Sequence, residues 1–260
     1  MTGGEYRCRV CGLLQPEAIW GTDGQCPTYS ICECCGCEFG YEDSSVEGIR
    51  RHRERWLAGD AAWLEPDKKP SQWNRDEQLA LVPAFYLRVL AGLPGTGPAP
   101  LPFSAAGIGT HAEGFVVEFT LPTSEKWVGN FQPGAGGASA ALAAPDAAQA
   151  LVVSGGQGYV IEPTERALVR CFGGTICDVL FLPEQGALIV GNGLWFERVE
   201  RGEIVWESRR ISWDGMTSVA VAGSNVVGEA YDPMTDAWTS FEVDLETGKI
   251  RGGSYPLELP

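Results

Sequence analysis

Seven of the nine cysteines lie between Cys8 and Cys37, and four of these form two Cys-x-x-Cys-Gly turns, at residues 8–12 and 32–36. Twenty residues separate Cys11 from Cys32. Each turn, called a hook below, places two sulfurs together, and its glycine permits the positive φ that directs backbone N–H groups at them. Tetrahedral zinc needs four such donors. The spacing therefore predicts one structural Zn²⁺ bound by Cys8, Cys11, Cys32 and Cys35.

The cysteine pattern leaves two other uses open. The thiols could form a disulfide framework, or they could serve redox or catalytic chemistry. Four thiolates leave a zinc ion no open position for a substrate, so the spacing favours a structural ion. Cys26, Cys34 and Cys37 are surplus, and the pattern leaves open whether any of them takes part in metal binding.

The cysteine distribution and a proline-rich stretch divide the chain. Only Cys171 and Cys177 lie beyond residue 37, and residues 91–102 hold four prolines and three glycines. We expect a small zinc-ribbon α+β module over residues 1–85, a Pro/Gly-rich linker over 86–104 and an all-β domain over 105–260. The sequence shows no secretory leader and no apolar run of eighteen residues. Free or metal-bound thiols fit a reducing compartment, so we expect a cytoplasmic protein that spans no membrane.

Two helices are expected after the hooks. Ser44 and Ser45 are N-cap residues for a helix over about 46–57, and Asn74 with Glu77 forms a capping box that opens a short helix ending near residue 81. The first helix carries the basic cluster of residues 50–55, which includes His52. We interpret this cluster as a solvated helix face, with a docking site for an acidic group or nucleic acid as the alternative.

The remaining sequence is typical of strands joined by tight turns. Short β-branched and aromatic runs alternate with Gly-rich turns every eight to twelve residues, which indicates an all-β domain. A weak repeat of about thirty to forty residues starts near Ala150, Asp178 and Ser218. This repeat is typical of β-propeller blades, and we expect a propeller-like domain or a β-sandwich. Residues 134–150 are small and glycine-rich, and we expect a loop there.

The amino-terminal third resembles a known family. Residues 6–12, 29–36 and 38–41, followed by Trp56, Trp63 and residues 66–70, are similar to the small bacterial cysteine-rich CPCC proteins. The sequence departs from the family pattern at Glu33 and Cys37. Some genes of that family lie beside bacterial toxin genes, so the resemblance implies an immunity role. It extends over roughly residues 6–82.

The sequence shows no catalytic motif. His52 and His111 are the two histidines, and we find no HExxH, no P-loop and no GxSxG motif. Carboxylates are numerous, so a hydrolase with a carboxylate pair in the β domain is one alternative. We expect no enzymatic activity.

The charge limits the class of partner. The formal net charge is −15, which disfavours nucleic acid and favours a basic protein. Taken with the immunity role that the family resemblance implies, the charge leads us to expect a binding protein that neutralises a bacterial toxin, such as a basic nuclease, through an acidic surface including Asp232, Asp236 and Trp238. The other alternative is a zinc-ribbon regulatory or nucleic-acid adaptor that uses the residues 50–55.

Overall fold

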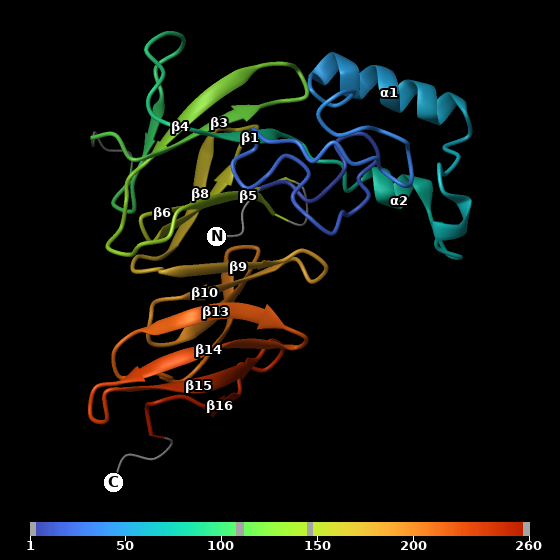
Figure 1. Ribbon diagram of the computed structural model, residues 1–260. Helices are drawn as coiled ribbons and strands as arrows, with labels where there is room; N and C mark the ends of the chain where they lie inside the picture. Colours follow the sequence, from blue (N-terminus) through green and yellow to red (C-terminus); the bar gives the residue numbers. More distant parts are fainter. Residues whose placement is uncertain (1–3, 108–111, 145–147, 257–260) are drawn as a thin grey trace.

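A computed structural model describes residues 4–107, 112–144 and 148–256 (Figure 1). The described chain is mostly β, with sixteen strands in four sheets of four strands each, and few helices. The sheets follow one another along the chain and are stacked in that order, from the first sheet at the top of Figure 1 to the fourth at the bottom. Residues 4–82, called the cysteine region below, lie beside the upper sheets.

The first sheet corrects the expectation of a linker over residues 86–104. Its strands are β1 Tyr86–Leu90, β2 Leu101–Phe103, β3 Phe115–Thr120 and β4 Lys126–Phe131, in the order β1-β3-β4-β2. Two of the four strands thus come from the expected linker. The proline within β2 is compatible with a strand because β2 lies at the edge of the sheet, where a missing N–H breaks no interior ladder.

The other three sheets are antiparallel meanders of consecutive strands. Their first strands begin 38 residues apart, at Ala140, Asp178 and Met216. The second sheet comprises β5 Ala140–Ala143, β6 Ala150–Ser154, β7 Gln157–Glu162 and β8 Ala167–Gly173. The third comprises β9 Asp178–Leu182, β10 Ala187–Gly191, β11 Phe196–Glu200 and β12 Glu203–Glu207. The fourth comprises β13 Met216–Ala222, β14 Asn225–Asp232, β15 Ala237–Asp244 and β16 Ile250–Gly252.

Strand β5 contradicts the loop expected over residues 134–150. Its alanines pair with β6, and Ala140, Ala141 and Leu142 are buried between neighbouring sheets. Small side chains fit in β5 because neighbouring sheets cover both of its faces. The small size of these residues was therefore not evidence of a loop.

Three apolar layers join the successive sheets. Within β6, Ala150 and Val152 pack toward the first sheet, whereas Leu151 and Val153 pack toward the third. Strands covered on both faces are buried at every position and mostly apolar, as β6 and β10 are. Strand β15 alternates instead, with Phe241 and Val243 buried and Glu242 exposed, because the fourth sheet packs by one face.

Each meander also contains a glycine covered by a cross-strand phenylalanine ring. An added Cβ at these glycines would lie 2.5–2.7 Å from the ring, so the close approach requires glycine. The pairs are Gly158–Phe172, Gly191–Phe196 and Gly228–Phe241.

Both expected helix starts in the cysteine region are confirmed. Helix α1, Val46–Ala58, begins after Ser45, whose side chain accepts a hydrogen bond from Gly48 N. Helix α2, Arg75–Leu79, begins after Asn74, which accepts from Asp76 N and Glu77 N. A short 3₁₀ helix, η1 Pro66–Lys68, lies between them. None of the helices in the described ranges is long and apolar enough to cross a bilayer.

Candidate metal centre

The two hooks have the same local geometry. In the first, Gly12 N donates to Cys8 O (2.8 Å) and Cys8 N donates to Leu13 O (2.9 Å). In the second, Gly36 N donates to Cys32 O and Cys32 N to Cys37 O, both at 2.9 Å. Gly12 and Gly36 have φ values of 80° and 72°, as the Cys-x-x-Cys-Gly pattern predicts. Each hook therefore forms a tight turn with its two sulfurs on the same side.

The four predicted ligands lie together. The Sγ atoms of Cys8, Cys11, Cys32 and Cys35 are all within 4.8 Å of one another, and all four residues are buried. The two hooks meet at Cys8–Cys35 (Sγ–Sγ 3.7 Å) and Cys11–Cys32 (3.6 Å). A tetrahedron with metal–sulfur bonds of about 2.3 Å sets neighbouring sulfurs about 3.8 Å apart. The group therefore has the donors and the spacing that a metal ion requires.

The cysteines are not paired as disulfides. All nine lie among the described residues, and all nine are free. The sulfur separations at the centre are also far longer than the roughly 2.05 Å of a disulfide bond. The alternative of a disulfide framework is therefore wrong.

The protonation of the group explains why it suits a cation. Hydrogen bonding, foremost with Cys32, and burial raise the pKa of the Cys11 thiol well above its ordinary value. At Cys8, burial acts to raise the pKa, but hydrogen bonds with the neighbouring thiols outweigh it and the pKa is lowered. Without a cation the buried thiols share protons, because four thiolates cannot be packed together. A divalent ion replaces those protons on binding.

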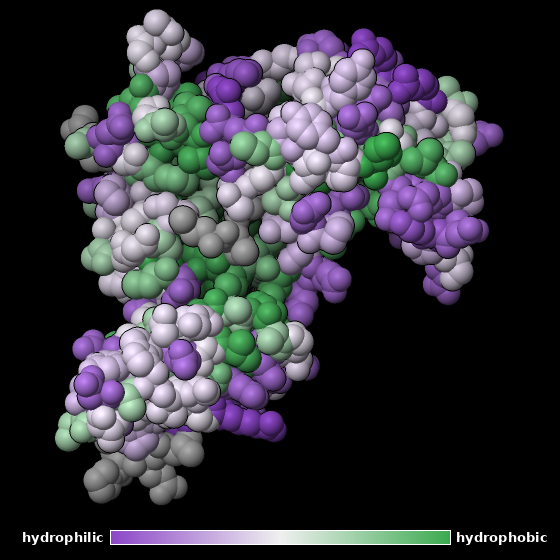
Figure 2. Space-filling view, in the orientation of Figure 1, coloured by the Kyte–Doolittle hydropathy of each residue, from purple (hydrophilic) through white to green (hydrophobic). Residues whose placement is uncertain are grey.

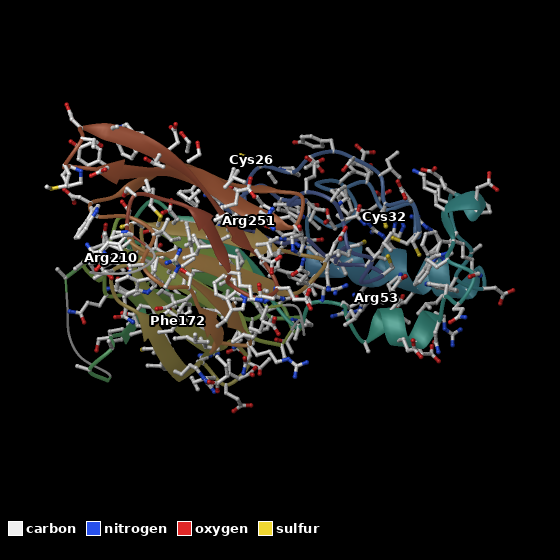
Figure 3. The ribbon with its side chains drawn as sticks, turned by 90° about the horizontal axis from the view of Figure 1, so that it is seen from below. Cys26, Cys32, Arg53, Phe172, Arg210 and Arg251 are labelled. Carbon is white, nitrogen blue, oxygen red and sulfur yellow. The ribbon has the colours of Figure 1, made fainter. Side chains whose placement is uncertain are left out.

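Helix α1 supplies hydrogen bonds to the backbone of both hooks. Figure 3 labels Arg53 of this helix and Cys32 of the second hook, on the same side of the molecule. His52 Nε2 lies 2.9 Å from Cys35 O, and its Nδ1 lies 2.8 Å from Arg55 Nη2. Since Arg55 can only donate, His52 is the tautomer with the proton on Nε2. Arg53 donates to Val10 O (2.7 Å) and to Arg9 O (2.6 Å).

These contacts correct the interpretation of residues 50–55 as a solvated helix face. His52 is 5 % exposed and Arg53 is half-buried against the first hook, whereas Arg50 and Arg51 are exposed. The signal that could have revealed this is helical spacing: residues 49, 52, 53 and 56 share a face, and Ile49 and Trp56 are apolar. His111 lies outside the described residues.

Amide side chains complete the surroundings. Gln78 Nε2 donates to Cys11 O (3.0 Å) and lies 3.4 Å from Cys34 Sγ, while Trp73 Nε1 holds its Oε1 at 2.7 Å. Gln15 Nε2 lies 3.9 Å from Cys32 Sγ. Cys34 is buried beside the four-sulfur group but does not belong to it. The sequence pattern did not single out either glutamine.

We expect Arg53→Met to weaken metal binding by roughly 10- to 100-fold, because Arg53 holds the carbonyls of the two residues between Cys8 and Cys11. Competition with a chromophoric chelator measures the change in Kd. Arg51→Met removes an exposed arginine from the same helix and serves as the matched control. Equal affinities for the two variants would contradict a supporting role for Arg53.

The residues predicted to bind a partner lie elsewhere, at the turn between β14 and β15. Asp236 Oδ1 accepts from Tyr231 Oη (2.7 Å), and Asp232 accepts from Met234 N and Thr235 Oγ1, both at 2.9 Å. Trp238 packs against Tyr231 with ring centroids 5.2 Å apart. The structure thus brings Asp232, Asp236 and Trp238 together in one hairpin, apart from the cysteines.

Comparison with known proteins gives no family for the chain. No protein-family model matches it, and a search of curated proteins finds no significant match. The resemblance of residues 6–82 to the CPCC proteins therefore stays a prediction, and four buried cysteines that could bind a metal ion are the site that the structure defines.

Proposed function

We propose that the four cysteines bind one Zn²⁺ ion that stabilises the fold and takes no part in catalysis. Four sulfur donors complete a tetrahedral shell, and the group is buried, so a substrate has neither a free position nor access. Nine free thiols suit a reducing compartment, which supports a cytoplasmic location.

The activity we propose is non-enzymatic binding of a basic protein, and one observation carries it. The fourth sheet buries Val226, Phe241 and Val243 against the third sheet, but its opposite face is uncovered in the described residues. Strand alternation places Glu229, Tyr231, Trp238 and Glu242 on that opposite face. A sheet that ends the stack therefore presents its second face to a partner.

The chemistry of this outer face fits a basic partner. Residues 214–256 hold seven Asp or Glu and two Lys or Arg. Trp238 is 49 % exposed beside Tyr231, and exposed Trp and Tyr are the side chains that most often dominate binding energy at interfaces. Carboxylates around them steer a basic protein and repel nucleic acid.

Two narrower statements belong to the same proposal. The partner is a bacterial toxin with a basic surface, which rests on the family resemblance and the acidic face. The stacked sheets are propeller-like units that form a domain separate from the zinc-ribbon module, supported by the 38-residue spacing between the first strands of the last three sheets.

The experiment is a binding measurement against the protein encoded beside this chain's gene, by biolayer interferometry at several salt concentrations. We expect Trp238→Ala to cost more than about 2 kcal/mol, roughly thirtyfold in Kd, because Trp238 is the aromatic anchor of the face. Glu229→Gln with Glu242→Gln should slow association and reduce its salt dependence.

Tyr41→Ala is the matched control, since Tyr41 is an aromatic residue 72 % exposed in the cysteine region. Absence of binding by the wild-type protein would refute the toxin proposal. Equal losses for Trp238→Ala and Tyr41→Ala would refute the assignment of binding to the outer face of the fourth sheet.

A further inference from the structure

An open groove separates the cysteine region from the last two sheets. Its volume is about 540 Å³, and its walls come from four parts of the chain: residues 14–16, the end of β9 with the β9–β10 turn, the end of β13 with the β13–β14 turn, and Leu245 after β15. In Figure 2, hydrophobic residues gather beside the notch beneath the cysteine region, where the upper and lower parts of the molecule meet. A second hollow of about 440 Å³ adjoins it and shares Gln185 and Leu245.

The floor of the groove is apolar. Leu14, Pro16, Leu182, Pro183 and Val221 line it, together with Leu245. Val221 is 40 % exposed. Val221 lies on β13, which is an edge strand of its sheet. Apolar residues left accessible in a concave surface gain free energy when an apolar segment covers them.

The rim carries negative charge. Glu184, Asp244 and Glu246 line the two hollows, and hydrogen bonds from Thr247 lower the pKa of Asp244. The cation within these linings, Arg198, is buried. It is bound by Glu200 (2.7 Å), Gln185 Oε1 (2.9 Å) and Leu245 O (2.7 Å). Its charge is therefore neutralised within the protein, and the carboxylates of Glu184, Asp244 and Glu246 leave the rim with negative charge, although Asp244 Oδ1 accepts hydrogen bonds from Thr247.

We propose that this groove binds an extended peptide segment of another protein, with apolar side chains on the floor and Lys or Arg side chains at the rim. Charge decides between this occupant and a second copy of the chain, because two copies that each carry a net charge of −15 repel one another. This site is distinct from the outer face of the fourth sheet and does not depend on it.

The groove also depends on the metal centre. Its upper wall contains Leu14, which forms an antiparallel bridge with Arg7. The adjacent Leu13 accepts the hydrogen bond of Cys8 N that closes the first hook. Removing the metal ion therefore loosens one wall of the groove while the fourth sheet keeps its packing on the third.

Fluorescence anisotropy with a labelled heptapeptide, Lys-Leu-Lys-Val-Lys-Leu-Lys, tests the proposal on the full-length, metal-loaded protein. We expect saturable binding, at least tenfold weaker binding by Val221→Asp, and unchanged binding by Val169→Asp. Val169 is the matched control because it is 46 % exposed on β8, outside the groove. The peptide with glutamate in place of lysine should not bind.

Chelation of the metal should weaken peptide binding at least tenfold, whereas Trp238→Ala should leave it unchanged. No binding of the lysine peptide, or equal binding by Val221→Asp and wild type, overturns the proposal. Sedimentation velocity tests whether a second copy of the chain occupies the groove instead. A dimer that the Val221→Asp substitution dissociates would show that it does, and would overturn the peptide proposal. Circular dichroism confirms that each variant is folded.

Discussion

A Cys32→Ser variant should lose its metal ion and lose the ordered structure of the cysteine region. Six of the fifteen buried residues in the apolar cluster of that region are cysteines, and its large aromatic side chains are Phe39, Trp56, Trp63 and Tyr86. Binding of a structural zinc supplies roughly 10–16 kcal/mol in small zinc-binding peptides. That is comparable to the roughly 5–15 kcal/mol net stability of a typical domain. Without the ion, this cluster is too small to keep the region folded.

Native mass spectrometry should find one zinc per chain in the wild type and none in Cys32→Ser. Hydrogen exchange should show that residues 4–82 lose protection while β10 and β14 keep theirs. Cys26→Ser is the control, because Cys26 is an exposed thiol of the same region. The proposal that the ion stabilises this region is wrong if Cys32→Ser retains full protection from hydrogen exchange around the hooks.

A Glu5→Gln variant should be destabilised by about 3–5 kcal/mol, because it leaves the buried Arg9 guanidinium without its counter-charge. Glu5 is 0 % exposed and accepts two hydrogen bonds from Arg9, at 2.7 and 2.8 Å. Its Oε1 also accepts from Leu87 N of β1 (2.9 Å). The Arg9 guanidinium lies between the rings of Trp20 (4.3 Å) and Tyr86 (4.7 Å). The pair thus joins the first hook to the first sheet.

Thermal unfolding followed by circular dichroism should show a Tm lower by roughly 6–20 °C for Glu5→Gln. Combining it with Arg9→Met should restore part of the loss, because the double variant no longer buries a guanidinium, while the buried Asp43 keeps its hydrogen bonds from Trp20 Nε1 (2.8 Å) and Gly40 N (2.6 Å). Asp76→Asn breaks an exposed ion pair with Arg75 and should leave Tm unchanged. A Glu5→Gln variant as stable as Asp76→Asn would show that the pair does not stabilise the fold.

The four-cysteine site that could bind a metal ion was predictable from sequence because its geometry is local. A Cys-x-x-Cys-Gly segment determines its own turn, so two hooks at suitable spacing imply the four sulfurs that the structure brings together. Helix starts at Ser45 and Asn74 followed from side-chain capping, which is equally local. Helical spacing places Arg53 on the buried face of its helix, but the partners of Arg53 and Gln78 could not be found from local patterns, because they are 43 and 67 residues away.

The sequence indicated that most of the chain forms β-strands, but it did not indicate every strand or its bounds. Alternating and continuous apolar runs indicated strands, and the repeat near Asp178 matches the start of the third sheet. Two strands were not expected from the sequence, because β2 contains proline and β5 consists mostly of alanine. Proline is tolerated in β2 because β2 is an edge strand, and alanine fits β5 because both faces of β5 are covered. One face of β15 is uncovered because the fourth sheet is the last in the stack. The position of a sheet in the stack depends on the whole chain and not on a local sequence pattern.

The equal spacing of the last three sheets has a consequence for how such a chain changes in length. Each interval of 38 residues carries one complete meander of four strands, so an insertion or deletion of that size preserves strand direction. A change by an odd number of residues within a strand would shift side chains from one face to the other. Homologous chains should therefore gain or lose whole sheets at the carboxyl end, while the cysteine hooks stay unaltered.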